Sequence, residues 1–363
     1  MKIGIDARMI DHPGIGRYIS SLIPEVARQA RKKDSFVLFG DPLKLRDLAE
    51  EPNVRIVPWD APIYSIREQI EHPYGREDID LVHFPHFNIP VFYRKKMVVT
   101  IHDLIYVLFP ESVPSAAAKH YARFMIGKAL KNAGSVISVS KHTKDDLVKV
   151  YGPSYAGKIR VIYEAADKRF QRVEDEDRIE EVRKKYSLSR DIVLYVGSIK
   201  PHKNVKKLIE IYSKVKSWGV PHELVLAGRW DSKEDHLKEA IDDNKDIRYI
   251  GEVPLDDLVV LYSMAGVVVN LSLYEGFGLT PLEAMQCGAP VVVSNTTSVP
   301  EVVGDAAFVV SPFNIGQISD TIYNVLVNEK LRIGMMESGF DHARRFSWER
   351  TARETLDVYH SNE

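Results

Sequence analysis

Residues 270–301 read NLSLYEGFGLTPLEAMQCGAPVVVSNTTSVPE, the most informative stretch of the chain. An apolar run leads up to Glu275, and the tight, glycine-bearing turn Gly276–Gly278 follows it. The pattern predicts a helix that begins at Pro281 with Thr280 as its N-cap, because Thr caps helices and Pro suits the first helical position. A second apolar run closes the stretch. The order strand, turn, helix, strand is the repeating unit of a parallel α/β sheet.

Two carboxylates give the same stretch a chemical meaning. Glu283 follows Glu275 with seven residues between them and lies in the first turn of the predicted helix. The backbone N–H groups from Gly278 to Thr280 would be available to phosphate oxygens at the helix N-terminus. The two glutamates would flank this anion site as acceptors for hydroxyl groups. Pairs of glutamates are usually solvated, but the glycine turn and the two apolar runs make this pair more specific.

Apolar runs alternate with helical patterns along the whole chain. Solid Val, Ile and Leu runs are typical of parallel strands that helices cover on both faces. The strands predicted in the first half are Lys2–Asp6, Phe36–Phe39, Val54–Val57, Leu81–Phe84, Met97–His102, Ser135–Val139 and Ile159–Tyr163. Those predicted in the second half are Ile192–Gly197, Glu223–Ala227, Ile247–Ile250, Val267–Leu271, Pro290–Val293 and Ala307–Val310.

The chain has 363 residues, which fits two domains better than one. A charged segment around Glu174–Asp177 separates two series of strands and is expected to form a solvated helix after a linker. We therefore expect an N-terminal Rossmann-like domain over residues 1–166 and a C-terminal one over residues 167–345. Residues 346–363 should form a helix, capped by Ser347, that crosses back to the N-terminal domain.

Composition excludes several classes of protein. Hydrophobic residues make up 45% and charged residues 28%, as in ordinary globular proteins. Lys and Arg number 49 against 51 Asp and Glu, and this near balance argues against a nucleic-acid partner. Cys287 is the only cysteine, so no intrachain disulfide can form, which favours a cytoplasmic location. The first residues, MKIGIDARMI, do not read as a secretory signal, and no apolar run is long enough to span a membrane.

Two glycine-containing segments differ in what they predict. Gly14–Arg17 lies between the first strand and the helical pattern Ile19–Ala30, so it predicts a contact with phosphate or sugar, although it lacks the third glycine of a dinucleotide fingerprint. Gly152–Lys158 has Walker A spacing, but Ile159 replaces the metal-binding Ser or Thr and the segment precedes a strand. We interpret the second match as false.

Residues 197–204, GSIKPHKN, follow the first strand of the second half and lead into the helical pattern Val205–Trp218. Their basic residues Lys200, His202 and Lys203 suit a diphosphate. Ligands of open α/β sheets bind outside the carboxyl ends of the strands, where this segment is expected to lie.

The stretch at 270–301 resembles the E-x7-E region of retaining glycosyltransferases of family 4. The resemblance covers nearly the whole chain and rests on further motifs in the family's order: GIGRY at 14–18, TIHDL at 100–104, SVSKHTKDDL at 138–147, YVGSIKPHKN at 195–204, YIGEV at 249–253 and SVPEVVG at 298–304. It implies the α/β fold of GT-B architecture, with two Rossmann-like α/β/α domains facing each other across a cleft. The N-terminal domain would bind the acceptor, and the C-terminal domain would bind the nucleotide-sugar donor.

The resemblance also implies roles for matching residues. Catalytic roles fall to His102, Asp103 and Glu275. The donor-binding residues are Gly197, Ser198, Lys200, His202, Lys203, Gly251, Glu252, Val253, Gly276, Phe277, Gly278, Leu279, Thr280 and Glu283. The loop on the acceptor and phosphate side consists of Gly14, Ile15, Gly16 and Arg17. Many relatives carry an arginine where this chain has Ser198, which puts phosphate coordination there in doubt; Lys200 or His202 could compensate.

Within this set, Glu275 and His102 would contact the donor sugar, and Asp103 would support His102 or the acceptor. Lys203 would neutralise the diphosphate, and Glu283 would accept hydrogen bonds from the ribose. The resemblance implies no metal or other cofactor. Two D-x-D segments, Asp78–Asp80 and Asp175–Asp177, have the spacing of metal-dependent transferases, but their charged surroundings indicate solvated surface.

The expected reaction is transfer of a hexose, with mannose from GDP-mannose favoured, to a glycan or lipid-linked acceptor in polysaccharide or lipopolysaccharide synthesis. Three alternatives remain open: a donor based on UDP or dTDP, a sugar-nucleotide 2-epimerase of the same fold, and a non-catalytic sugar-nucleotide-binding subunit. The intact E-x7-E pair and Lys203 argue against the last of these.

Residues 115–133 predict an amphipathic helix, with Ala122, Met125, Ile126 and Ala129 on one face and basic residues on another. The sequence leaves two interpretations of this helix open. It is either a peripheral surface at the inner face of the membrane or an ordinary surface helix.

Overall fold

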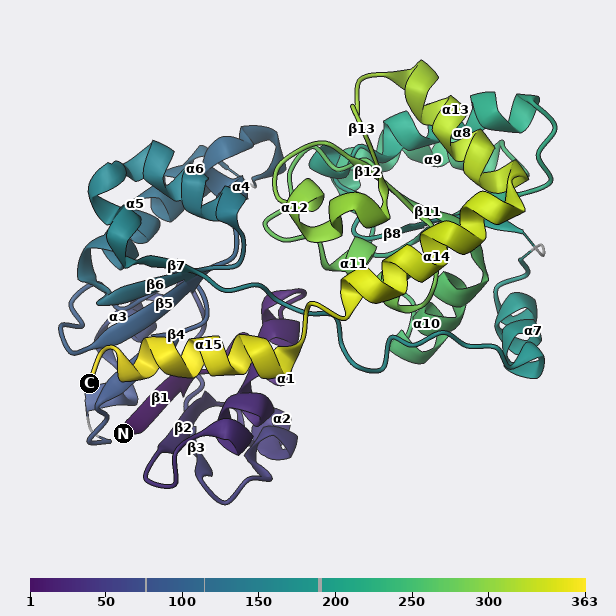
Figure 1. The fold of residues 1–363 in the computed structure, drawn as a ribbon. Helices are drawn as coiled ribbons and strands as arrows, with labels where there is room; N and C mark the ends of the chain where they lie inside the picture. Colours follow the sequence, from purple (N-terminus) through teal and green to yellow (C-terminus); the bar gives the residue numbers. More distant parts are fainter. Residues whose placement is uncertain (76, 114, 189–190) are drawn as a thin grey trace. The chain divides into compact units, whose positions relative to one another are not determined.

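The computed structural model describes residues 1–75, 77–113, 115–188 and 191–363 (Figure 1). The chain divides into two compact units. Unit 1 consists of Met1–Ala165 and Ser347–Glu363, and unit 2 consists of Ala166–Phe346. These divisions lie within one residue of the expected domain boundaries.

In unit 1 the described residues form a parallel seven-stranded sheet with the order β3-β2-β1-β4-β5-β6-β7. Its strands are β1 (Lys2–Asp6), β2 (Ser35–Gly40), β3 (Val54–Pro58), β4 (Leu81–Phe84), β5 (Met97–Ile101), β6 (Ser135–Ser138) and β7 (Ile159–Val161). Its helices are α1 (Ile15–Gln29), α2 (Pro42–Leu45), α3 (Ile66–Ile70), α4 (Ile105–Leu108), α5 (Ala116–Asn132), α6 (Lys141–Tyr151) and α15 (Trp348–His360).

In unit 2 the described residues form a parallel six-stranded sheet with the order β10-β9-β8-β11-β12-β13. Its strands are β8 (Ile192–Val196), β9 (Glu223–Ala227), β10 (Ile247–Gly251), β11 (Ala265–Asn270), β12 (Val291–Ser294) and β13 (Phe308–Val310). Its helices are α7 (Glu176–Lys185), α8 (Val205–Ser217), α9 (Lys238–Asp242), α10 (Leu255–Met264), α11 (Leu279–Gln286), α12 (Val299–Val303), α13 (Ile315–Val327) and α14 (Glu329–Ala343).

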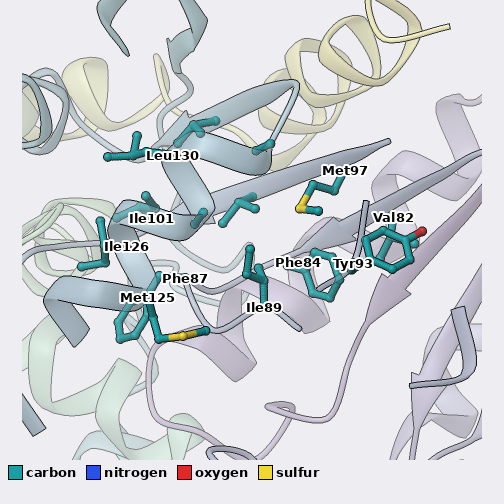
Figure 2. Packing of buried hydrophobic residues seen from close by; sticks show 14 of the residues in the cluster. Val82, Phe84, Phe87, Ile89, Tyr93, Met97, Ile101, Met125, Ile126 and Leu130 are labelled. Carbon is teal, nitrogen blue, oxygen red and sulfur yellow. The ribbon is translucent and has the colours of Figure 1, made fainter. Parts of the chain in front are cut away.

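Each apolar run predicted as a strand is a strand in one of these sheets, so the predicted α/β class is confirmed. The strands are apolar on both faces because both faces are covered. Figure 2 shows one covered face of unit 1, where Val82 and Phe84 of β4 belong to the same core cluster as Met125 and Ile126 of α5. The buried face predicted for residues 115–133 is therefore confirmed.

The intervening residue of β4, His83, is buried in a polar contact. Its Nδ1 lies 2.7 Å from the hydroxyl of Tyr359 in α15, and its Nε2 lies 2.8 Å from Thr100 Oγ1. Burial lowers the pKa of His83 to about 3, so the ring is neutral. The last helix, α15, also packs along α1 within unit 1 (Figure 1). Ser347 caps α15 by accepting a hydrogen bond from the backbone N–H of Arg350, as predicted.

Residues Pro153–Lys158, within the false Walker match, form a 3-10 turn that precedes β7. A P-loop would follow a strand, so the rejection of this match is confirmed. Within the described ranges no helix has both the length and the apolar character needed to cross a bilayer.

Candidate functional site

The strand order of unit 2 marks a candidate binding site. From the central strand β8 the chain adds β9 and β10 on one side and then returns to add β11, β12 and β13 on the other. The order therefore reverses between the neighbouring strands β8 and β11. Open α/β sheets bind ligands at the carboxyl ends of the strands beside such a switch point. The two predicted donor segments follow these two strands.

The loop after β8 runs beside the loop after β9. Gly197 donates its backbone N–H to Ala227 O at 2.9 Å, and Ile199 donates to Arg229 O at 2.8 Å. A side chain at position 228 would not fit, because a Cβ atom added to Gly228 would lie 2.0 Å from Gly197 O. Ser198, which replaces the family's arginine, accepts a hydrogen bond from the Tyr195 hydroxyl through its backbone oxygen. This part of the site is built from backbone.

Of the basic residues Lys200, His202 and Lys203, one is buried and two are partly exposed. Pro201–Lys203 forms a 3-10 turn, in which His202 is buried and its carbonyl accepts a hydrogen bond from Leu273 N at 2.7 Å. Burial, helped by the charge of Lys203, lowers the pKa of His202 to about 3. His202 is therefore neutral and links the two donor segments, whereas Lys200 and Lys203 keep partly exposed side chains. Compensation for the missing arginine by Lys200 or His202 stays a prediction.

Lys203 and Glu275 form an ion pair at the switch point. Lys203 Nζ lies 2.6 Å from Glu275 Oε1, and the two side chains are only 18% and 14% exposed. Ser272 Oγ donates to the same carboxylate oxygen at 2.7 Å. Burial alone would raise the pKa of Glu275, but the charge of Lys203 and the hydrogen bonds from Lys203 and Ser272 hold it below its ordinary value. The carboxylate is ionised at neutral pH and fixed in place.

Thr297 and Ser298, which were not among the predicted site residues, hold the Glu275 loop. Thr297 Oγ1 accepts the backbone N–H of Glu275 at 3.0 Å, and Ser298 Oγ donates to the carbonyls of Glu275 and Phe277, both at 2.9 Å. Thr297 has a left-handed backbone, with φ of 52°. The polar run SNTTS, which begins at Ser294, the last residue of β12, could have signalled these contacts.

The helix of the E-x7-E segment begins earlier than predicted. α11 starts at Leu279, and its N-cap residue is Gly278 with φ of 103°. Thr280 is therefore the second residue of the helix, and its prediction as N-cap was wrong. The cause is that a left-handed turn of this kind favours glycine, so the cap position falls on Gly278. Gly278 has no side chain to cover the helix N-terminus.

α8 begins in a similar way. Its N-cap residue, Asn204, has a left-handed backbone with φ of 59° and makes no side-chain cap hydrogen bond. The Asn204 amide instead donates to Leu271 O at 3.3 Å, at the end of β11. The N-termini of α8 and α11 thus follow neighbouring strands without a capping side chain. Helix N-termini carry partial positive charge and suit a phosphate group.

Glu283 lies deeper than Glu275. Its side chain is buried in α11, and Tyr262 of α10 donates its hydroxyl to Glu283 Oε2 at 3.1 Å. The contact with ribose hydroxyls implied by the resemblance stays a prediction.

The loop after β10 completes this edge of the sheet. Gly251 has φ of 74° and accepts a hydrogen bond from Gly228 N at 2.7 Å through its carbonyl. Glu252 is exposed and pairs with Arg229, with 3.1 Å between Arg229 Nε and Glu252 Oε1. Val253 is half-buried. The loops after β8, β9, β10 and β11 therefore adjoin one another, and together they carry the predicted donor-binding residues.

The remaining predicted residues belong to unit 1. His102 follows β5, and its Nδ1 lies 2.9 Å from Glu164 Oε1 while its Nε2 lies 2.9 Å from Pro85 O. Each ring nitrogen of His102 thus lies within hydrogen-bond distance of an oxygen atom. Burial would lower the pKa of His102, but the hydrogen bond and charge of Glu164 raise it above its ordinary value. Both ring nitrogens are in use within unit 1.

Asp103 has a local structural contact. Its Oδ1 accepts the backbone N–H of Ile105 at 2.8 Å and so shapes the start of α4. A catalytic role for Asp103 stays a prediction.

The glycine loop of unit 1 is closed by its own chain. Gly14 is the N-cap of α1, with φ of 82°, and Ile15 and Gly16 are buried in the first turn. Gly16 N donates to His12 O at 2.7 Å, and a Cβ atom at position 16 would lie 1.9 Å from Ile10 O. The glycine at 16 thus serves a close backbone approach, and its N–H is not available to a ligand in this conformation. Arg17 is half-buried beside it.

Among the described residues no group of three or more His, Cys, Asp or Glu side chains could hold a metal ion. The two D-x-D segments have structural contacts instead. Asp175 caps α7, and Asp80 Oδ2 accepts the backbone N–H of Lys2 at 2.7 Å.

Comparison with known proteins adds the family. The model of the Glycosyl transferases group 1 family matches residues 177–341, and that of Glycosyltransferase Family 4 matches residues 14–170. The chain is 29% identical to the O-antigen chain mannosyltransferase B of Escherichia coli, over 99% of each chain. It is 28% identical to the O-antigen chain mannosyltransferase RfbU of Salmonella typhimurium, over 81% of this chain and 78% of the relative. The crystal structure of Anabaena HepE in complex with UDP and glucose superposes with a TM-score of 0.77 at 19% identity, covering 99% of this chain and all of the other.

Proposed function

This chain belongs to the family 4 glycosyltransferases of GT-B fold, and from that premise we propose that it is a retaining mannosyltransferase that uses GDP-mannose. The acceptor is a hydroxyl group of a glycan or lipid-linked saccharide in bacterial polysaccharide or lipopolysaccharide assembly. The observation that carries the donor site is the half-buried Lys203–Glu275 pair at the switch point between β8 and β11.

The difficult part of this reaction is charge separation. The bond between the anomeric carbon and the diphosphate oxygen breaks, so the sugar becomes positive while the leaving diphosphate gains negative charge. Preorganised charges aimed at the leaving group stabilise such a transition state. Lys203 and the uncapped N-termini of α8 and α11 would supply that charge from fixed positions. No metal ion is needed in this arrangement.

Glu275 would bind the donor sugar rather than attack it. Its carboxylate is ionised and held by Lys203 and Ser272, so it can accept a hydrogen bond from a sugar hydroxyl with little reorganisation. In the retaining route, the acceptor oxygen attacks the face that the diphosphate leaves, and the departing phosphate takes the acceptor proton. Neither Glu275 nor His102 forms a covalent bond to the sugar.

Glu252 supports guanine as the base of the donor. A carboxylate only accepts hydrogen bonds. Guanine presents two neighbouring donors, N1–H and the 2-amino group, on one edge, whereas uracil and thymine present one donor between two carbonyl oxygens. Glu252 follows β10 next to Gly251, in the segment that the family resemblance assigns to the base, and its exposed ion pair with Arg229 is weak enough to exchange.

The mannosyl donor also has support from the relatives. Both enterobacterial proteins described above are named as mannosyltransferases of the O-antigen chain, and the first aligns with this chain over nearly its whole length.

The proposal is tested with ¹H NMR by following GDP-mannose in the presence of the protein. α-Mannotriose is offered as the acceptor, and water takes that role if the saccharide is not used. We expect release of GDP and a new sugar whose first-formed anomer is α, like the donor. Lys203→Ala and Glu275→Ala should each lower the rate by at least about tenfold while the protein stays folded. A β product would contradict retention, and an epimerised nucleotide sugar without GDP release would contradict transfer.

A further inference from the structure

Unit 1 has a switch point of its own. The order β3-β2-β1-β4-β5-β6-β7 reverses between the neighbouring strands β1 and β4. The chain leaves β4 at Phe84 and continues through His86, and side chains from three other segments gather around this position. We call Tyr64, His86, Tyr106 and Tyr121 the aromatic cluster. The donor chemistry proposed above does not use them.

Tyr64 contacts two other rings of the aromatic cluster, and the three tyrosines remain accessible. The Tyr64 and Tyr121 centroids lie 5.8 Å apart at 85°, and those of Tyr64 and His86 lie 6.1 Å apart at 75°. Tyr64 is 50% exposed, Tyr106 37% and Tyr121 36%. Burial and the charges of Tyr106 and Tyr121 raise the pKa of Tyr64. Accessible aromatic rings with polar tips are thus concentrated at one place.

A buried chain of hydrogen bonds holds Tyr121. Its hydroxyl donates to Asn88 Oδ1, and Asn88 Nδ2 donates to Glu68 Oε1 at 2.6 Å. Glu68 also pairs with Arg8 at 3.2 Å, and Arg8 pairs with Asp6 at the end of β1 at 2.7 Å. The Arg8, Glu68 and Asp6 side chains are each less than a tenth exposed. Tyr121 is therefore presented in one orientation, so a ligand that stacks on it meets a preorganised ring.

Tyr64 has a strained backbone. Its φ of 66° lies in the left-handed region that favours glycine and asparagine. Strain of this kind collects at ligand-binding positions, where the surrounding structure maintains it. The conformation sets the Tyr64 ring edge-on to both Tyr121 and His86.

The charges beneath the aromatic cluster favour a neutral ligand. Arg8 is already paired with two carboxylates, Asp6 and Glu68, and the charge of Asp103 reaches both Tyr64 and Tyr106. Burial and the charge of His102 hold the pKa of His86 well below its ordinary value, so the His86 ring is neutral. His86 Nδ1 accepts the backbone N–H of Asn88 at 3.3 Å, so the ring proton lies on Nε2. A phosphate or an anionic lipid headgroup would meet these carboxylates without a spare cation in the network.

We propose that the aromatic cluster binds a sugar ring of a neutral glycan, which is the acceptor of the reaction. The C–H face of a sugar packs on the Tyr64 and Tyr121 rings, while hydroxyl groups exchange hydrogen bonds with the Asp103 carboxylate and the His86 N–H. The identification of this glycan as the acceptor rests on the proposed function. The binding of a neutral glycan to the aromatic cluster does not require sugar transfer.

The test is saturation-transfer NMR on the full-length protein with three neutral probes: α-mannotriose, maltotriose and chitotriose. We expect saturation of the C–H protons of at least one probe. Tyr64→Ala and Tyr121→Ala should weaken its binding by at least about tenfold, which is about 1.4 kcal/mol. Tyr64→Phe, which keeps the ring, should bind within about threefold of the original protein. Phe92→Ala is the matched control, because Phe92 is another exposed aromatic residue of unit 1, at 77% exposure.

Three results would overturn the inference: no probe saturates with the original protein, both alanine variants bind as the original does, or Phe92→Ala loses as much affinity as they do. Co-sedimentation with vesicles containing anionic lipid tests the membrane alternative. Vesicle binding that depends on Tyr64 and Tyr121, without saccharide binding, would overturn the inference and make a membrane surface the ligand of the aromatic cluster. Thermal stabilisation by GDP-mannose, measured in the same variants, should be unchanged. If the original protein binds a saccharide but no nucleotide sugar, the proposed function fails and the glycan site stands.

Discussion

Replacing Lys203 with methionine removes the cation of the Lys203–Glu275 pair while keeping a side chain of similar length. The pair has a contact of 2.6 Å, and both side chains are less than a fifth exposed. Breaking a buried pair typically costs about 3–5 kcal/mol, because the remaining charge is left without a partner. Since both groups keep some contact with solvent, we expect about 3 kcal/mol. For a unit of this size, that loss lowers the midpoint of thermal unfolding by roughly 6–12 °C.

The pH dependence of this loss follows from the pKa of Glu275. In the original protein that pKa lies below its ordinary value, so the carboxylate stabilises the fold above the unfolded pKa of 4.5, and this contribution is lost as the pH falls through the folded value. In Lys203→Met the burial of Glu275 dominates and reverses the sign. The penalty is then largest at neutral pH and shrinks on acidification, because a protonated Glu275 no longer needs a cation.

The assay is thermal and urea unfolding of Lys203→Met, Glu275→Gln and the double variant at pH 7 and pH 5, with GDP release from GDP-mannose measured in parallel. The double variant should recover at least about 1 kcal/mol relative to the sum of the single variants, yet remain at least about tenfold less active. Lys207→Met is the matched control, since the Lys207–Glu210 pair on α8 is more exposed and worth about 0.5 kcal/mol. Equal stability of Lys203→Met and the original protein at pH 7, with no coupling in the double variant, would refute the reasoning.

Three further predictions concern the base, the donor loops and the pH response. Glu252→Gln should lower the ratio of GDP affinity to UDP affinity by about tenfold in calorimetric titrations, because an amide N–H donor replaces one of the two carboxylate oxygens that accept hydrogen bonds. An unchanged ratio would contradict a role of Glu252 in base recognition. Gly228→Ala should destabilise unit 2 by at least about 2 kcal/mol in urea unfolding and abolish donor binding, because the added Cβ meets Gly197 O at 2.0 Å and φ is 137°. Gly334→Ala, with open space around it in α14, should instead stabilise by up to about 1 kcal/mol, so similar effects of the two changes would contradict the packing argument. Because the pKa of His102 is raised in the folded protein, the charged ring stabilises the fold below the unfolded pKa of 6.5, and this contribution is lost as the pH rises through the folded pKa. His102→Gln should therefore cost more stability at pH 6 than at pH 9. A cost that does not vary with pH would contradict a charged His102–Glu164 pair.

The fold could be predicted from the sequence because its strands are buried on both faces. Runs such as Val291–Ser294 leave no polar alternation to misread, and each such run lies in one of the two sheets. Strand ends were less certain by a residue or two. The run Met97–His102 ends as a strand at Ile101, because His102 turns toward Glu164 and Pro85.

The site was predicted where its signals are local in sequence. The Lys203 and Glu275 segments each follow a strand, and topology brings them to the same switch point. The cap of α11 was mistaken because the Thr-Pro pair is a strong local signal, whereas the left-handed Gly278 is set by the path of the loop. Contacts between distant segments gave no local signal at all. Tyr262 on Glu283 is one case, and the buried chain from Arg8 to Tyr121 is another.

The proposed binding of GDP-mannose by unit 2 at the Lys203–Glu275 pair is tested most directly by thermal unfolding with a panel of donors. The panel contains GDP-mannose, GDP, UDP-glucose, UDP-N-acetylglucosamine, dTDP-rhamnose and ADP-glucose. A ligand present at 100 times its dissociation constant stabilises the folded state by about 2.7 kcal/mol. We expect this shift for GDP-mannose and GDP with the original protein, and a much smaller one with Lys203→Met. A shift with UDP or dTDP ligands and none with GDP, or equal shifts in the original protein and Lys203→Met, would contradict it.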